Sequence, residues 1–213
     1  MLYFLLHDAE RWQRDLVPLL TSAWRARSFA PCRELHHLLH AEIRAFHDTI
    51  GRTSEDTLIE KAPGLSFDRT LWRELVGEVL WFGAAETPNF QTEPDLLCCL
   101  LAPERYRAGD GPRESWAAIE QAHFGSRDLR LGGYYRAGQS GWNDAADVAR
   151  LRAALAAIDG GNWSVADLLH YREALDDAER LEVLDDARGA LGRLVEMYGQ
   201  AQTRGQVVIC EEV

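Results

Sequence analysis

The two ends of the chain carry short, uninterrupted runs of apolar residues, a pattern typical of strands buried on both faces. The first run covers residues 1–6 and stops before Asp8, a residue type that starts helices; the second covers Val207–Cys210 and follows Gly205, which suits a helix end. Unpaired strands of this kind would promote aggregation. We therefore expect the two ends to pair with each other in one small sheet.

Between the ends, apolar residues recur at the spacing of amphipathic helices. The pattern predicts helices over about 9–26, 31–50, 67–82, 95–102, 113–123, 143–159, 164–175 and 178–204. Pro18 predicts a kink or break near residue 17, and Ser66 is expected to cap the third helix. Residues 51–65 are expected to be a polar connection, and residues 128–136 an extended segment. The order predicts a mostly helical α+β fold, with a small sheet formed by the two terminal strands and the extended segment near 128–136.

Length and composition are those of an ordinary globular protein. The chain has 213 residues, of which 46% are hydrophobic and 27% charged, and a chain of this size buries about 70% of its unfolded surface. We expect one globular domain over 1–213. The alternative is a division into a helical part, 1–125, and an α+β part, 126–213.

The charge balance is acidic and excludes some classes of partner. The 34 Asp and Glu residues outnumber the 23 Lys and Arg residues, which gives a formal net charge of −11. A field of this sign repels phosphate backbones and anionic lipids, so we expect neither a nucleic-acid nor a membrane partner. The same charge keeps a protein soluble and would suit a basic protein partner.

Other compositional features point to a bacterial cytoplasm. The apolar start has no basic region before it, and no run approaches the 18 apolar residues of a membrane-spanning helix. The four cysteines form no Cys-x-x-Cys pair, which is typical of a reducing compartment. Lys61 is the only lysine, which indicates the codon usage of a GC-rich genome.

The helix expected over 31–50 carries the first candidate for chemistry. His36, His40 and His47 form one stripe beside its apolar face, and a histidine pair at i and i+4 can chelate zinc or another divalent ion. Imidazoles at the edge of a core are also common, and the Glu of a His-Glu-x-x-His motif is missing. Both explanations stay open, with the three histidines as candidate metal ligands.

Two glutamates interrupt apolar helix faces. Glu42 lies inside the apolar arc of the second helix and Glu78 inside that of the third. A buried carboxylate is costly unless it is paired, so we expect Glu42 to be mostly buried and to have a charged or hydrogen-bonding partner. If both glutamates converge with the histidines, they form a metal or proton-transfer site. If each pairs with an arginine such as Arg69 or Arg73, they are structural.

Two further features are weighed in the same way. Cys98 and Cys99 lie in a very apolar helix and are expected to be reduced and unreactive. The proline-bounded loop 86–94 either lines a pocket or is a plain connector. No Gly-x-Ser-x-Gly elbow, Walker loop or dinucleotide fingerprint occurs in the sequence.

The C-terminal half resembles a known family. The segment Gly133–Tyr135, the helix through Asp147–Leu151, the helix ending near Tyr198 and the strand Val207–Ile209 are similar to the YfbM-like family of uncharacterised bacterial proteins. The resemblance covers about 129–213 and implies an α+β fold. That family has no established activity, so the resemblance implies no catalytic residue and no cofactor.

Two functions are compatible with these features. The first is a non-enzymatic cytosolic binding or regulatory protein, for example an immunity-type protein that binds a basic toxin. The second is a metal-assisted hydrolase that uses the histidine stripe with Glu42 and Glu78. Whether these side chains converge in space separates the two.

Overall fold

The sheet that joins the two ends of the chain lies at the centre of the fold. A computed structural model describes residues 2–50, 57–108, 114–131, 140–169, 171 and 175–212. Strand β1 (Leu2–Asp8) pairs in antiparallel fashion along its whole length with β4 (Gln206–Glu212), and Leu5 lies opposite Ile209. The predicted pairing of the ends is confirmed.

The rest of the sheet differs from the prediction. The strand order is β1-β4-β3-β2, with β3 (Ser140–Asn143) beside β4 and the short β2 (Arg127–Asp128) at the edge. Of the segment expected at 128–136, only the first residue is in a strand, and residues 132–139 lie outside the described residues. The sequence of β3 has neither an apolar run nor a period of two, so its pattern did not indicate a strand.

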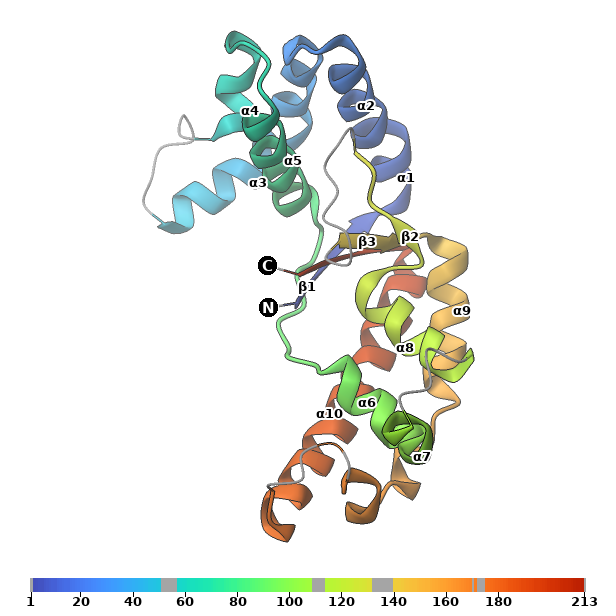
Figure 1. Cartoon of the computed structure of the whole chain (residues 1–213). Coiled ribbons are helices and arrows are strands. Elements are labelled where there is room, and N and C mark those ends of the chain that lie inside the picture. The colour runs from blue at the N-terminus through green and yellow to red at the C-terminus, as the bar shows by residue number, and fades with distance from the viewer. Residues whose placement is uncertain are drawn as a thin grey trace.

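Helices cover both faces of this sheet, as Figure 1 shows. On one face lie α1 (Ala9–Arg11), a π-helical segment (Trp12–Leu16), α2 (Val17–Ala26), α3 (Arg33–Ile50), α4 (Leu58–Lys61) and α5 (Arg69–Gly83). On the other lie α6 (Pro94–Leu101), α7 (Pro103–Arg107), α8 (Glu114–Phe124), α9 (Ala145–Ala156) and α10 (Asp177–Arg204). The mostly helical α+β class is confirmed.

The two long strands, β1 and β4, separate the interior into two hydrophobic cores. Phe4, Leu6 and Cys210 belong to the core with α6, α8, α9 and α10, whereas Leu5 and Ile209 belong to the core with α2, α3 and α5. Successive residues of a strand point to opposite faces. Both faces of β1 and β4 are therefore buried, which explains why their sequences are continuously apolar instead of alternating.

Several helix boundaries refine the predictions. The break expected near residue 17 is a π-helical turn, where the Val17 N–H bonds to the Trp12 carbonyl just before Pro18, which has no N–H. Helix α5 is capped by Asp68, and not by Ser66: the Asp68 carboxylate accepts hydrogen bonds from the N–H groups of Thr70 and Leu71.

Three other segments also depart from the predictions. The segment 51–65, expected to be a polar connection, contains α4 and the buried Ile59. In the range 164–175, where a helix was expected, the structure has a 3-10 turn at Val165–Leu168, and residues 170 and 172–174 lie outside the described residues. The sequence did not predict α7. Helix α10 does end at Gly205, whose φ of 64° suits glycine. No helix among the described residues is long and apolar enough to cross a membrane.

Candidate metal centre

Two histidines of the predicted stripe lie side by side on α3. The ring centroids of His36 and His40 are 5.2 Å apart, with 60° between the ring planes. The apolar face of α3 packs into the core through the fully buried Leu35, Leu39 and Ile43. Because this face is fixed, the two imidazoles lie at the boundary between core and solvent, with His36 half-buried and His40 exposed.

A glutamate from α4 completes the group. The Oε1 atom of Glu60 lies 3.5 Å from Nδ1 of His36, and the side chain of Glu60 is only 13% exposed. Helix α4 is held by the buried Ile59 and by the carboxylate of Glu78, which accepts hydrogen bonds from the backbone N–H groups of Leu58 and Ile59, each at 2.9 Å. Glu78 therefore positions the helix that presents Glu60.

The three side chains have the composition and spacing of a metal site. One ligand atom from each of His36, His40 and Glu60 lies within 4.8 Å of the others. A tetrahedral zinc site with metal–ligand distances of about 2.0 Å brings ligand atoms to about 3.3 Å from one another. Metal binding at these three residues would therefore require side-chain rotations that bring the ligand atoms closer together. Two histidines and one glutamate are also the protein ligands of one class of catalytic zinc sites, whose fourth position is open to water.

Two atoms of the group are buried without a hydrogen-bond partner. Nδ1 of His36 and Oε2 of Glu60 make no hydrogen bond to any described residue. A buried polar atom without a partner costs about 1–3 kcal/mol, and more where the group is charged. A cation held by His36 and Glu60 would remove this cost, so the donor set fits a metal.

Glu42 belongs to a different interaction. Its Oε1 accepts a hydrogen bond from Nη1 of Arg11 at 2.6 Å, and the same guanidinium also donates to the Leu38 carbonyl. The prediction of a charged partner is confirmed, with Arg11 in place of Arg69 or Arg73. Glu42 is partly buried, with its side chain 36% exposed, so it lies at the boundary of the core and not within it. The apolar arc of α3 faces the core at Leu39 and Ile43, and Glu42 lies at its edge beside α1.

The predicted convergence of both glutamates with the histidine stripe does not occur. The carboxylate of Glu42 is engaged by Arg11 and that of Glu78 by the start of α4, and the metal-ligand group among the described residues includes neither. His47 lies on α3, but its side chain is outside the described part of the chain. Glu60 was missed because its segment is mostly polar; the apolar pair Leu58-Ile59 just before it was the available signal for local burial.

The cysteines offer no second centre of reactivity. All four are free and buried. Burial raises the pKa of Cys98 to about 12 and that of Cys99 to about 11. Thiolates are the reactive form, so these values support the prediction that both side chains are unreactive.

No protein-family model, curated protein or solved structure matches this chain. The resemblance of residues 129–213 to the YfbM-like family therefore stays a prediction. The functional argument is carried by the chemistry of the site itself.

Proposed function

We propose that this protein binds a divalent transition metal, with zinc the best fit, through His36, His40 and Glu60. The observation that supports the proposal is that Nδ1 of His36 and Oε2 of Glu60 are both buried without a hydrogen-bond partner among the described residues, on side chains that approach to 3.5 Å. A second imidazole lies one helical turn away. A mixed imidazole and carboxylate set suits zinc, whereas magnesium and calcium prefer oxygen ligands alone.

The metal would link α4 to α3. His36 and His40 come from one long helix and Glu60 from a four-residue helix, so coordination would fix the shorter element against the longer one. The bound ion would also present its fourth position on the solvent side, beside the exposed His40. A zinc ion held there would supply Lewis acidity to a water bound beside it.

We favour a binding or regulatory role for the metal over hydrolysis. A hydrolase needs a general base and a substrate cavity beside the ion, but Glu42 and Glu78 are engaged elsewhere. Three cavities of the described chain are lined by residues of α2, of α9 with α10, and of the 91–97 segment with α10. None of the three involves α3 or α4. An acidic surface that meets a basic protein partner stays part of this proposal.

Zinc titration of the chelator-treated protein tests the site. We expect one tightly bound zinc per chain by calorimetry, and a higher midpoint of thermal unfolding in its presence, because a ligand of the folded state stabilises it. His36→Gln, His40→Gln and Glu60→Gln should each weaken binding at least tenfold. His37→Gln is the matched control, since His37 is exposed on the same helix and is not in the ligand group.

The metal-free variants separate a metal site from a structural ion pair. If Glu60 is a ligand, Glu60→Gln replaces a buried charge with a neutral amide, so the metal-free variant should be at least as stable as the metal-free parent. If Glu60 instead serves a salt bridge with His36, the variant should be less stable. Lower stability together with absent or non-stoichiometric zinc uptake would refute the proposal.

A further inference from the structure

A cavity lies on the opposite face of the sheet from the metal centre. It has a volume of about 300 Å³ and lies between the 91–97 segment, which ends in α6, and helix α10. This size is at the lower end of small-molecule sites. The loop 86–94 was expected either to line a pocket or to connect two helices, and its residues Gln91–Glu93 do line this cavity.

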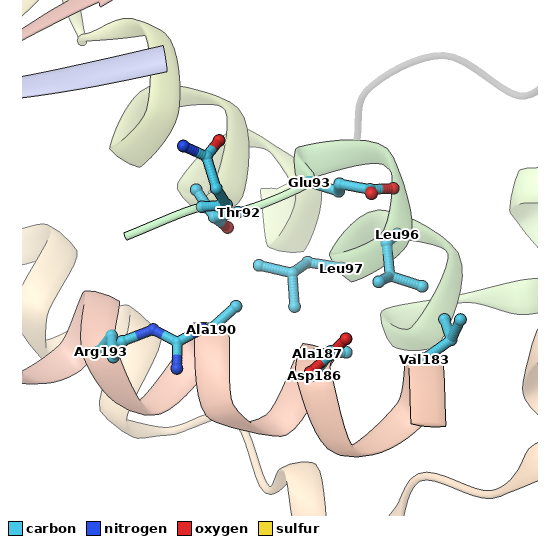
Figure 2. A pocket seen from close by; sticks show the side chains of 10 residues that line it. Thr92, Glu93, Leu96, Leu97, Val183, Asp186, Ala187, Ala190 and Arg193 are labelled. Carbon is cyan, nitrogen blue, oxygen red and sulfur yellow. The ribbon is translucent and has the colours of Figure 1, made fainter. Parts of the chain in front are cut away.

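The cavity combines an apolar wall with charges of both signs. Leu96 and Leu97 line it from α6, and Figure 2 shows Leu97 reaching between the two helices. Arg193 and Asp186 line it from α10, with Arg193 on the C-terminal side of Asp186. Arg193 and Asp186 are seven residues apart, so their Cα atoms lie about 10 Å apart along the helix axis. Both are exposed, and neither forms an ion pair within the described part of the chain.

The hydroxyl of Thr92 can act toward the cavity only as a hydrogen-bond acceptor, because its proton is already donated to His123. The buried ring of His123 places Nδ1 2.6 Å from the Ile119 carbonyl and Nε2 2.9 Å from Oγ1 of Thr92. The carbonyl can only accept, so Nδ1 carries the proton and Nε2 is the acceptor. Burial lowers the pKa of His123 to about 4, which keeps the ring neutral at pH 7. Thr92 therefore donates to His123, and its oxygen offers only lone pairs to the cavity.

The polar groups of the cavity thus define what a ligand must supply. Arg193 requires an acceptor, best a carboxylate. Asp186 and the Thr92 oxygen require donors. The third charged residue, Glu93, already accepts a hydrogen bond from the Tyr171 hydroxyl. Because two acidic side chains and one basic side chain line the cavity, a ligand with a cationic group is favoured over a simple anion.

We infer that this cavity binds a small zwitterion of dipeptide size, with its carboxylate on Arg193, its ammonium group on Asp186 and its apolar part against Leu96 and Leu97. A free amino acid holds its two charges on one carbon, whereas the ends of a dipeptide are separated enough to reach both side chains. The peptide N–H of a dipeptide can also donate a hydrogen bond to the Thr92 oxygen. No chemistry on the ligand follows from these groups, so the site is one of recognition.

Titrations followed by nuclear magnetic resonance test the inference, with L-alanyl-L-leucine and 6-aminohexanoate as probes. We expect saturable binding of at least one probe, with shifts confined to residues around 91–97 and 183–193. The C-terminal amide and the N-acetyl form of the dipeptide should each bind at least tenfold more weakly. Arg193→Gln and Asp186→Asn should cause losses of the same size, whereas Glu182→Gln, an exposed change on the same helix, should cause none.

Each alternative result counts against the inference. If neither probe binds, the cavity is not a zwitterion site. If the amide or the N-acetyl form binds as well as the parent dipeptide, the corresponding charge contact does not exist. Arg193 and Asp186 are exposed, so their variants should fold normally, and unchanged unfolding midpoints would confirm that any loss of binding is local.

Discussion

The side-chain amide of Asn143 donates a hydrogen bond to the hydroxyl of Tyr198, with 2.9 Å between Nδ2 and the hydroxyl oxygen. Asn143 is fully buried; its Nδ2 also donates to the Gln121 carbonyl, and its Oδ1 accepts from the backbone and side chain of Ser126. The Tyr198 hydroxyl in turn donates to the Ala122 carbonyl at 2.8 Å. One amide thus joins β3, α8 and α10 with all its hydrogen-bonding positions used.

Substitutions in this network should lower the free energy of unfolding strongly, although they change few atoms. Asn143→Leu should lower the free energy of unfolding by about 3 kcal/mol or more, because several buried groups lose their partners at once. Tyr198→Phe removes only the hydroxyl and should cost about 1–3 kcal/mol. Urea unfolding measures both effects. Tyr3→Phe, at a half-buried ring, is the control, and an equal effect there would contradict the assigned role of the network.

Replacing either of two glycines with alanine should change the stability of the fold, in opposite directions. A Cβ atom on Gly141 would lie 2.0 Å from the carbonyl oxygen of Phe124, whereas one on Gly77 of α5 would meet nothing within 4 Å. Gly141→Ala should therefore destabilise the fold by several kcal/mol, since backbone atoms must move. Gly77→Ala should stabilise it by about 0.5–1 kcal/mol through the helix propensity of alanine. Thermal unfolding of both variants checks the pair, and a tolerated Gly141→Ala would contradict the close approach of β3 to the end of α8.

Stability should fall as the pH is lowered through the range in which histidine usually titrates. Burial lowers the pKa of His7 to about 3 and that of His123 to about 4, from an ordinary value of 6.5. Between pH 6.5 and 4 the unfolded chain binds protons that the folded chain does not, so acid favours unfolding. Two such groups give a slope of up to about 2.7 kcal/mol per pH unit.

The window between pH 6.5 and 5 is the informative one, because most carboxylates titrate below it. Urea midpoints at steps of half a pH unit should fall steadily there, and His7→Leu should reduce the slope by about half even if it changes the absolute stability. His37→Gln, at an exposed position, should leave the slope as it is. A flat profile in the parent protein would show that neither buried histidine stays neutral.

The ion pair between Arg11 and Glu42 should contribute modestly to the free energy of unfolding. Both side chains are about one-third exposed, and solvent screens ion pairs at such positions, so Glu42→Ala should cost about 1 kcal/mol. Glu34→Ala, on the exposed side of α3, should cost less. Urea unfolding of both variants, with Arg11→Ala and the double variant to complete a cycle, measures the coupling. Equal midpoints for Glu42→Ala and Glu34→Ala would mean that the contact contributes nothing.

The sequence alone predicted the strands and helices whose burial follows from a local pattern of apolar residues. The terminal strands are buried on both faces, so their apolar runs indicated strands that must pair, and β1 and β4 do pair. The helical stripe of α3 likewise placed His36 and His40 together, because the 3.6-residue period alone brings i and i+4 to one side. Gly205 ends α10 because glycine has no Cβ and therefore adopts the left-handed conformation at a helix end without steric cost.

The tertiary structure decided which distant residues meet. Strand β3 exists because the edge of β4 offers hydrogen-bond partners to a segment whose own sequence does not favour a strand. Glu60 joins the histidines because Ile59 is buried and Glu78 holds the start of α4, and Glu42 is drawn to Arg11 of α1. Periodicity reports only which side of an element faces the core. The partner across that core depends on how the elements pack, so the histidine stripe gains its carboxylate ligand, Glu60, only through the packing of α4 beside α3.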